Sequence, residues 1–123
     1  MNKTIIPSKI LNEFFETILN RRFSEADKVL QEIERKIGEV DNNFKRGFLQ
    51  GLKGILYMYR SNDQDTFLST LDLTNINALK KYYSEFLEDS KKKLHSDYDR
   101  GYFSALAGYI RFILKSIESK QKS

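Results

Sequence analysis

The sequence predicts an all-α protein: a compact bundle of about six helices, built from a tandem duplication of a three-helix unit. Three observations support this prediction. Apolar residues recur at helical spacing through most of the chain, and polar capping residues precede several of these stretches. The 123 residues include only one proline, so long helices are permitted, and no strand is predicted. A glycine-containing stretch in the middle of the chain also recurs near its C-terminal end.

The repeated stretches are residues 43–59 and 97–113, which align at an offset of 54 residues. Six positions coincide: Phe44 with Tyr98, Arg46 with Arg100, Gly47 with Gly101, Phe48 with Tyr102, Leu52 with Leu106 and Gly54 with Gly108. At an offset of 53, the capping residues Ser24 and Asn77 coincide as well. The match favours two units, about 8–60 and 62–116, within a single domain over residues 1–123. The alternative is that amphipathic helices align by chance because they share one apolar period.

Small residues form a narrow stripe on each repeated helix. The stripe consists of Gly47, Gly51 and Gly54 in the first copy and of Gly101, Ala105 and Gly108 in the second. At about 100° per residue these spacings keep each set on one helix face. Each interior glycine costs a helix on the order of 1 kcal/mol relative to alanine, and close approach of another helix backbone would compensate. We therefore expect both helices at the centre of the bundle.

The first unit is expected to contain three helices. Pro7 and Ser8 can start the first, because proline is tolerated in a first turn and serine can cap. Ser24 and Asp27 have the spacing of a capping box, and Gly38 stands where a C-terminal cap belongs. The predicted helices run over about residues 8–20, from Ser24 to Gly38, and from just after Asp41 to about Arg60.

The second unit follows a clear break at residues 61–63, Ser-Asn-Asp. Asn77 can cap one of its helices, and Ser96 with Asp99 repeats the capping-box spacing before the last. The predicted helices run over about residues 64–72, from Asn77 to about Leu94, and from Ser96 to about Glu118, followed by a frayed tail over residues 119–123.

One segment carries a family resemblance. The run at residues 22–26, Arg-Phe-Ser-Glu-Ala, followed by Leu30 and Ile33, resembles the second half of a tetratricopeptide hairpin. Glu13 and Thr17 depart from the apolar or aromatic residues of the first half, so the resemblance covers only about residues 10–36. It implies a helical-hairpin module for protein–protein interaction, with Ala26 packing between its two helices.

Residue types needed for catalysis or metal binding are scarce. Cysteine is absent, and the one histidine, His95, stands just before a helix cap, where a surface position is expected. Asp97 and Asp99 are explained by capping and first-turn electrostatics. No cluster has metal-ligand spacing. The sequence therefore predicts no enzyme, no metal and no cofactor, unless carboxylates from distant segments converge.

A polar strip on the first repeated helix forms the expected interaction face. It comprises Arg46, Lys53, Tyr57 and Arg60, with Arg100 as the counterpart of Arg46 in the second copy. The simplest role for each arginine of the pair is to bond a first-turn carboxylate, such as Asp41 or Asp97. The sharper hypothesis is a shared recognition surface.

The class of partner follows from charge and aromatic content. Seven tyrosines favour protein interfaces, where the ring is buried and the hydroxyl stays hydrogen-bonded. The net charge of +4 and the cationic strip suit phosphates, with stacking rings adding affinity for single strands. The preferred hypothesis is a small adaptor or accessory subunit that binds another protein, or a second copy of itself. The alternative is a basic accessory protein that binds nucleic acid.

The sequence also predicts where the protein resides. No run of about 18 uncharged apolar residues is present, so no membrane association is expected. The N-terminus lacks the apolar stretch of a signal peptide, and the absence of cysteine fits a reducing compartment. We therefore expect a cytoplasmic protein.

Overall fold

The computed structural model describes residues 8–37, 42–61, 68, 71–92 and 95–122 of the chain. These residues form five helices and no strand, which confirms the all-α prediction. The helices are α1 (Ser8–Leu19), α2 (Phe23–Ile37), α3 (Asn43–Arg60), α4 (Ile76–Lys91) and α5 (Asp97–Lys122). The prediction of about six helices from a duplication is not confirmed. Most of the expected helix at 64–72 lies outside the described residues, and Leu71 and Asp72 are not helical.

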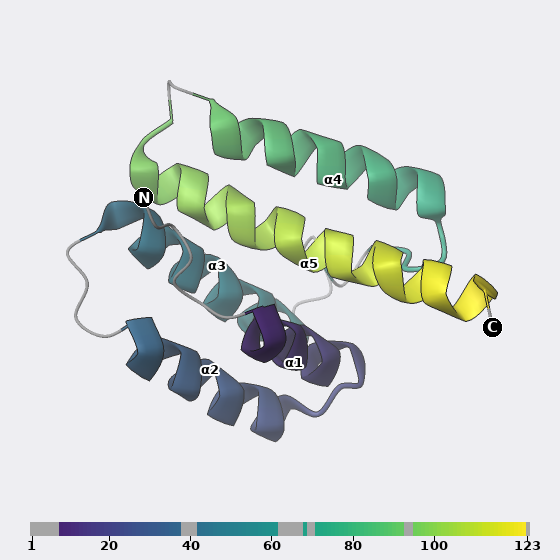
Figure 1. Cartoon of the computed structure of the whole chain (residues 1–123), viewed down its shortest axis with the longest axis horizontal. Coiled ribbons are helices and arrows are strands. Elements are labelled where there is room, and N and C mark those ends of the chain that lie inside the picture. The colour runs from purple at the N-terminus through teal and green to yellow at the C-terminus, as the bar shows by residue number, and fades with distance from the viewer. Residues whose placement is uncertain (1–7, 38–41, 62–67, 69–70, 93–94, 123) are drawn as a thin grey trace.

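Figure 1 shows α3 and α5 side by side, with α4 against α5 on one side and α1 and α2 on the other. The largest fully buried side chains come from all five helices: Phe14, Phe15, Ile18, Ile33, Leu52, Ile55, Leu79, Tyr109 and Ile110. One core therefore joins the helices. None of the described helices combines the length and the apolar character needed to cross a bilayer.

The backbones of α3 and α5 approach each other where two glycines remove the side chains. A Cβ atom at Gly47 would lie 2.7 Å from the carbonyl carbon of Tyr98, with the carbonyl oxygen closer still. A Cβ atom at Gly101 would lie 2.8 Å from the amide nitrogen of Phe48, and closer still to the carbonyl oxygen of Phe44. Real Cβ atoms essentially never come this close to other atoms, so the helix crossing requires glycine at both positions.

The rest of the small-residue stripe has other neighbours. A Cβ atom at Gly51 would lie 2.6 Å from the Cβ atom of Ala105, so these two residues continue the α3–α5 crossing. One at Gly54 would lie 3.3 Å from the hydroxyl of Tyr102. Gly108 instead faces α1, where the nearest ring carbon of Phe15 would be 3.8 Å away.

The turn between α1 and α2 corrects one predicted cap. Arg21 takes a left-handed conformation with φ 58°, and the Arg22 amide donates to the Thr17 carbonyl at 2.9 Å. This is the hydrogen-bonded pattern that commonly ends helices. The Arg22 carbonyl then accepts from the Ala26 amide at 2.9 Å, so α2 begins at Phe23. Ser24 lies within the first turn, and its prediction as the cap is wrong.

The last helix starts as predicted and ends later. The Ser96 hydroxyl accepts from the Asp99 amide at 3.1 Å, which confirms the predicted cap. The helix then continues to Lys122, so the frayed tail predicted from residue 119 is wrong over its described part. No glycine or proline follows Gly108, and nothing in the sequence therefore breaks the helix earlier.

The cap of α4 is Asn75 rather than the predicted Asn77. The Asn75 side chain accepts from the Ala78 amide at 3.0 Å, and its carbonyl accepts from the Leu79 amide at 3.0 Å. Just before it, the Asp72 carboxylate accepts from both the amide and the hydroxyl of Thr74. Because of this turn, the cap of α4 stands two residues before the predicted position. The helix ends at Lys91, and the predicted Leu94 lies outside the described residues.

The two asparagines offer a direct test of this assignment. Asn75→Ala is expected to lower the free energy of unfolding by about 1 kcal/mol, because the Ala78 amide loses its acceptor. Asn77→Ala is expected to leave stability unchanged or raise it by a few tenths of a kcal/mol, because alanine is the better helix former. Urea unfolding followed by circular dichroism measures both. Equal losses at the two positions would contradict the assignment.

Candidate functional site: the groove between α1 and α5

The predicted interaction face is divided between two places. The Lys53 ammonium pairs with the Glu34 carboxylate of α2 at 2.9 Å, so the polar strip of α3 lies beside α2. On that strip Tyr57 is 70% exposed, and Arg46 and Arg60 are also exposed. Arg100 belongs to the first turn of α5 and pairs with Asp97, the simplest role predicted for it. The cation of Lys53 is thus offset by a neighbouring carboxylate.

The lone histidine lies among side chains at the start of α5. The His95 ring packs against Phe103, with ring centroids 5.4 Å apart, and its Nε2 atom is 3.9 Å from the Asp89 carboxylate. Asp89 also pairs with Lys92 at 3.1 Å. Over the described ranges, no group of three or more histidine or carboxylate side chains could hold a metal ion.

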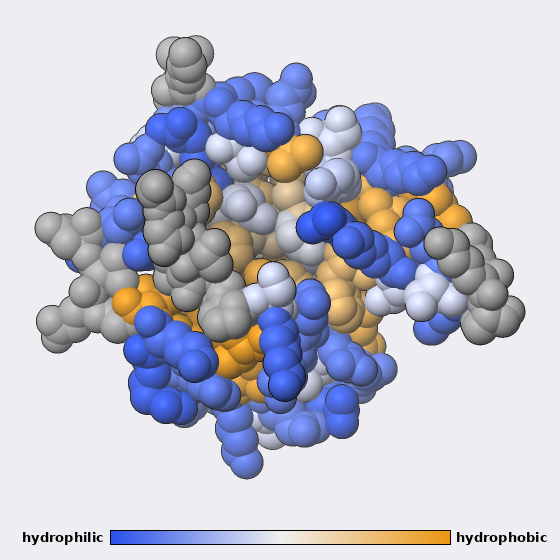
Figure 2. All heavy atoms as spheres, viewed as in Figure 1, coloured by the Kyte–Doolittle hydropathy of each residue, from blue (hydrophilic) through white to orange (hydrophobic). Residues whose placement is uncertain are grey.

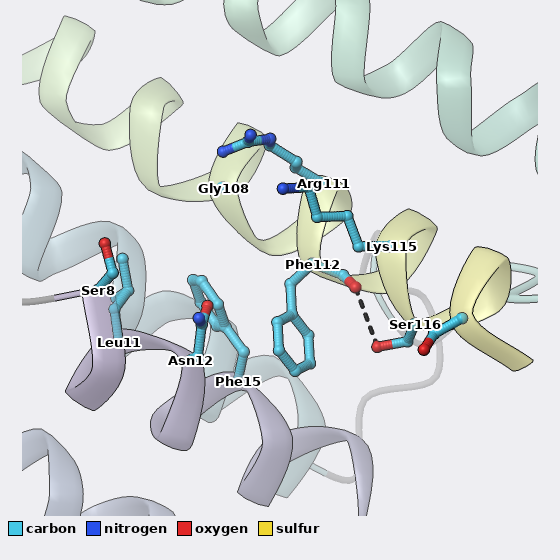
Figure 3. Close-up of a pocket in the computed structure, with 10 residues that line it drawn as sticks. Ser8, Leu11, Asn12, Phe15, Gly108, Arg111, Phe112, Lys115 and Ser116 are labelled. Carbon is cyan, nitrogen blue, oxygen red and sulfur yellow. Dashed lines mark hydrogen bonds between the residues drawn. The ribbon is translucent and has the colours of Figure 1, made fainter.

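A concavity lies between α1 and α5, where sequence reasoning placed no site. This α1–α5 groove has a volume of about 640 Å³. Ten residues line it: Ser8, Leu11, Asn12 and Phe15 from α1, and Gly108, Arg111, Phe112, Lys115, Ser116 and Ser119 from α5. In Figure 3 the Phe112 ring points from α5 toward Asn12 and Phe15 of α1, whereas Arg111 and Lys115 lie along α5 at the edge of the groove. In Figure 2 the face seen in Figure 1 is hollowed, with hydrophobic atoms at the bottom and hydrophilic atoms at the edge.

The floor of the groove is aromatic and held in place by the core. Phe15 is 1% exposed, and its ring packs against Tyr109 and Phe112 with centroids 5.4 and 5.7 Å apart. Gly108 leaves room beside this ring, because it carries no side chain of its own. Phe112 is only half-buried, so part of its ring remains open to the groove. The floor is therefore a preformed apolar surface.

The rim on the α5 side is cationic. Arg111 and Lys115 are both exposed, stand four residues apart and extend from the same side of α5 in Figure 3. Neither side chain forms an ion pair or a hydrogen bond with any residue in the described parts of the chain. Like charges at this spacing cost a helix about 0.2–0.5 kcal/mol. No carboxylate is among the residues that line the groove, so the lining itself carries a net positive charge.

A second hollow extends the groove along the same two helices. It has a volume of about 380 Å³ and shares Phe112 and Ser116 with the first. Its other lining residues are Glu16, Leu19, Asn20, Leu73, Ile113, Ile117 and Lys120. Here one carboxylate accompanies one ammonium, so the unbalanced positive charge is confined to the first hollow.

The sequence contains a faint signal of this site. Arg111 and Lys115 flank Phe112 in the run Arg-Phe-Ile-Leu-Lys, one turn after Gly108. By itself this pattern is typical of a solvated helix face beside a core stripe. Only the packing of α1 shows that the glycine and the phenylalanine border an open groove.

No protein-family model, curated protein or solved structure matches this chain.

Proposed function

We propose that this protein is a small helical adaptor or accessory subunit that binds another protein through the α1–α5 groove. The observation that carries the proposal is a preformed apolar floor, in which the half-buried Phe112 ring stays open to the groove beside the buried Phe15. The rim carries two cations, Arg111 and Lys115, that have no ion-pair partner among the described residues. A surface of this kind gains free energy when a partner covers its apolar part.

The shape of the groove favours a helical segment as the bound element. On α5 the lining runs from Gly108 to Ser119, about 16 Å at 1.5 Å per residue, and the second hollow extends it. An elongated apolar groove between two helices suits the apolar face of an amphipathic helix, which presents side chains at i, i+3, i+4 and i+7.

The scaffold itself supports an origin by duplication, which we include in the proposal. Gly47 packs on the backbone of Tyr98, and Gly101 packs on the backbone of Phe44. Gly47 corresponds to Gly101, and Phe44 to Tyr98, at the offset of 54 residues. Each copy therefore makes the same glycine-to-backbone contact with the other, as expected for two halves related by an approximate twofold axis. On this view the chain is a single domain made of two related units.

The hairpin of α1 and α2 supports the tetratricopeptide-like part of the proposal. The two helices pack against each other, and Ala26 is fully buried, as the resemblance implies for the small residue between the helices. A hairpin that presents one face of α1 to a partner fits an interaction module.

Site-directed photo-cross-linking in cells of the source organism tests the proposal. A benzophenone amino acid at Ser119, on the rim of the groove, is expected to form an adduct with one protein partner. The same group at Ser84, an exposed position of α4, serves as the matched control. The Ser119 adduct should disappear when Asn12→Trp places a large ring over the groove, and persist with Ser84→Trp.

Three outcomes would contradict the proposal. The first is an adduct that forms equally from both positions, and the second is one that survives Asn12→Trp. The third is an adduct sensitive to nuclease, which would favour the nucleic-acid hypothesis. An adduct of twice the chain's mass would identify the partner as a second copy. The nucleic-acid hypothesis has less support, since Lys53 in the α3 strip is already paired with Glu34.

A further inference from the structure

We infer that the segment bound by the α1–α5 groove is an acidic amphipathic helix, whose carboxylates pair with Arg111 and Lys115 while its apolar side chains cover the exposed parts of Phe112 and Leu11. This inference rests on the proposed function and specifies the chemistry of the partner. It concerns the first hollow, from Gly108 to Ser119, whose lining includes two cations and no carboxylate.

The charge of the lining residues selects an anionic partner. Arg111 and Lys115 are the titratable groups of the first hollow, and both are cations without an ion-pair partner in the part of the chain that the structure describes. Glu118, three residues after Lys115 on α5, does not line the first hollow, and Glu16 lines the second hollow together with Lys120. A basic partner would meet repulsion over the first hollow, whereas a carboxylate would find a cation at its rim.

The α1 side adds to the same preference. The first turn of α1 contains no acidic residue, so the partial positive charge of the helix N-terminus is not offset by a carboxylate there. Ser8, in that turn, lines the groove together with Asn12, Ser116 and Ser119. The Ser116 hydroxyl already donates to the Phe112 carbonyl at 3.0 Å, and Ser119 has a partner of its own. The exposed Ser8 hydroxyl and Asn12 amide can donate to a carboxylate without repelling it.

Spacing specifies how the acidic residues are arranged. Arg111 and Lys115 are separated by about 6 Å along the axis of α5, since each residue rises 1.5 Å. Two carboxylates at i and i+4 on one edge of a docked helix have the same spacing and can reach both cations. The adjacent edge of that helix then carries the apolar residues that cover the aromatic floor.

Two synthetic amphipathic helices, each about 16 residues long, test the inference. Both carry the same leucine and phenylalanine face; one has glutamates along its edge, and the other has lysines at the same positions. Fluorescence anisotropy gives the dissociation constants, and amide NMR shifts show whether residues of the groove respond. The acidic peptide is expected to bind about tenfold more tightly than the basic one, with the difference shrinking at high salt.

A charge-reversal variant and a matched control complete the design. Arg111→Glu combined with Lys115→Glu is expected to weaken binding of the acidic peptide about tenfold and to strengthen binding of the basic one. Lys80→Glu combined with Lys81→Glu changes the net charge equally at two exposed positions of α4. With this control variant, the affinities for both peptides should stay within about twofold of those of the unchanged protein, because salt screens charges that lie far from the groove.

Several results would overturn the inference. Equal binding of the two peptides, with no effect of the charge reversal, would show that the groove does not select charge. The cross-linking result would then still decide the proposed function separately. Absence of shifts at groove residues with either peptide would also overturn it. So would displacement of the acidic peptide by a single-stranded oligonucleotide that binds more tightly and depends on the same two cations.

Discussion

Replacing Gly47 with alanine is expected to lower the free energy of unfolding by about 3 kcal/mol, the upper part of the range for overpacked sites. The new Cβ atom would meet the backbone of Tyr98, which cannot rotate away as a side chain can. The helices α3 and α5 must then separate, which loosens the packing of the core between them. For a chain of this size the expected drop in melting temperature is about 12 °C.

Two further glycine variants make this result specific. Gly101→Ala is expected to cost a similar amount, because its Cβ atom would meet the backbone of Phe44 and Phe48. Gly108→Ala is the control: its Cβ atom would lie 3.8 Å from the Phe15 ring, an ordinary contact. Because alanine has a higher helix propensity than glycine, Gly108→Ala should raise the free energy of unfolding by up to about 1 kcal/mol. Thermal unfolding of all three proteins gives the comparison, and equal losses would refute the backbone contact.

Raising the pH above about 10 is expected to destabilise the protein through two tyrosines that lie against each other inside it. The hydroxyls of Tyr59 and Tyr109 are hydrogen-bonded at 2.6 Å, and Tyr109 is fully buried. Burial, together with the neighbouring hydroxyl of Tyr59, raises the pKa of Tyr109 far above its usual value. Burial also raises the pKa of Tyr59, although its hydrogen bond to Tyr109 and the charge of Arg21 oppose this.

The direction of the effect follows from proton binding. Below pH 10 both tyrosines are protonated in the folded and unfolded states, so their contribution to stability is fully present. Above pH 10 the unfolded chain releases these protons while the folded protein retains them. Each tyrosine then reduces the free energy of unfolding by about 1.4 kcal/mol per pH unit until its folded pKa is reached. Urea unfolding at pH 8 and pH 11 measures the loss.

A double-mutant cycle separates this pair from the other groups that titrate at high pH. At neutral pH, Tyr109→Phe is expected to cost about 1–2 kcal/mol, because the Tyr59 hydroxyl loses its partner in a half-buried position. The combination of Tyr59→Phe with Tyr109→Phe should recover much of this loss. The double variant should also show a shallower decline above pH 10. A decline as steep as that of the unchanged protein would refute the role of the pair.

Local sequence signals predicted the helices well and their ends less well. The apolar period places each described helix, because a side chain's position on a helix depends only on its spacing from its neighbours. Ser96 was identified as a cap from its own spacing to Asp99. The caps at Ser24 and Asn77 were wrong, since a preceding turn started each helix one or two residues earlier.

The candidate site was not predicted, and the reason is geometric. The cations chosen from the sequence lay on α3, where Lys53 proves to be paired with Glu34 of α2. Arg111 and Lys115 look like any solvated pair until α1 is placed beside them. A groove belongs to two helices that are distant in sequence, so no single stretch of sequence contains it.

The sequence by itself determined the all-α class, the helical stretches and the glycines that permit a close helix crossing, because each depends on residues within a few turns of one another. The tertiary structure decided which neighbour each glycine faces, with Gly47 against α5 and Gly108 against α1. It also decided which cations lie next to a carboxylate and which border an open apolar groove. Those properties depend on how helices far apart in the chain pack, and packing is set by all of their side chains together.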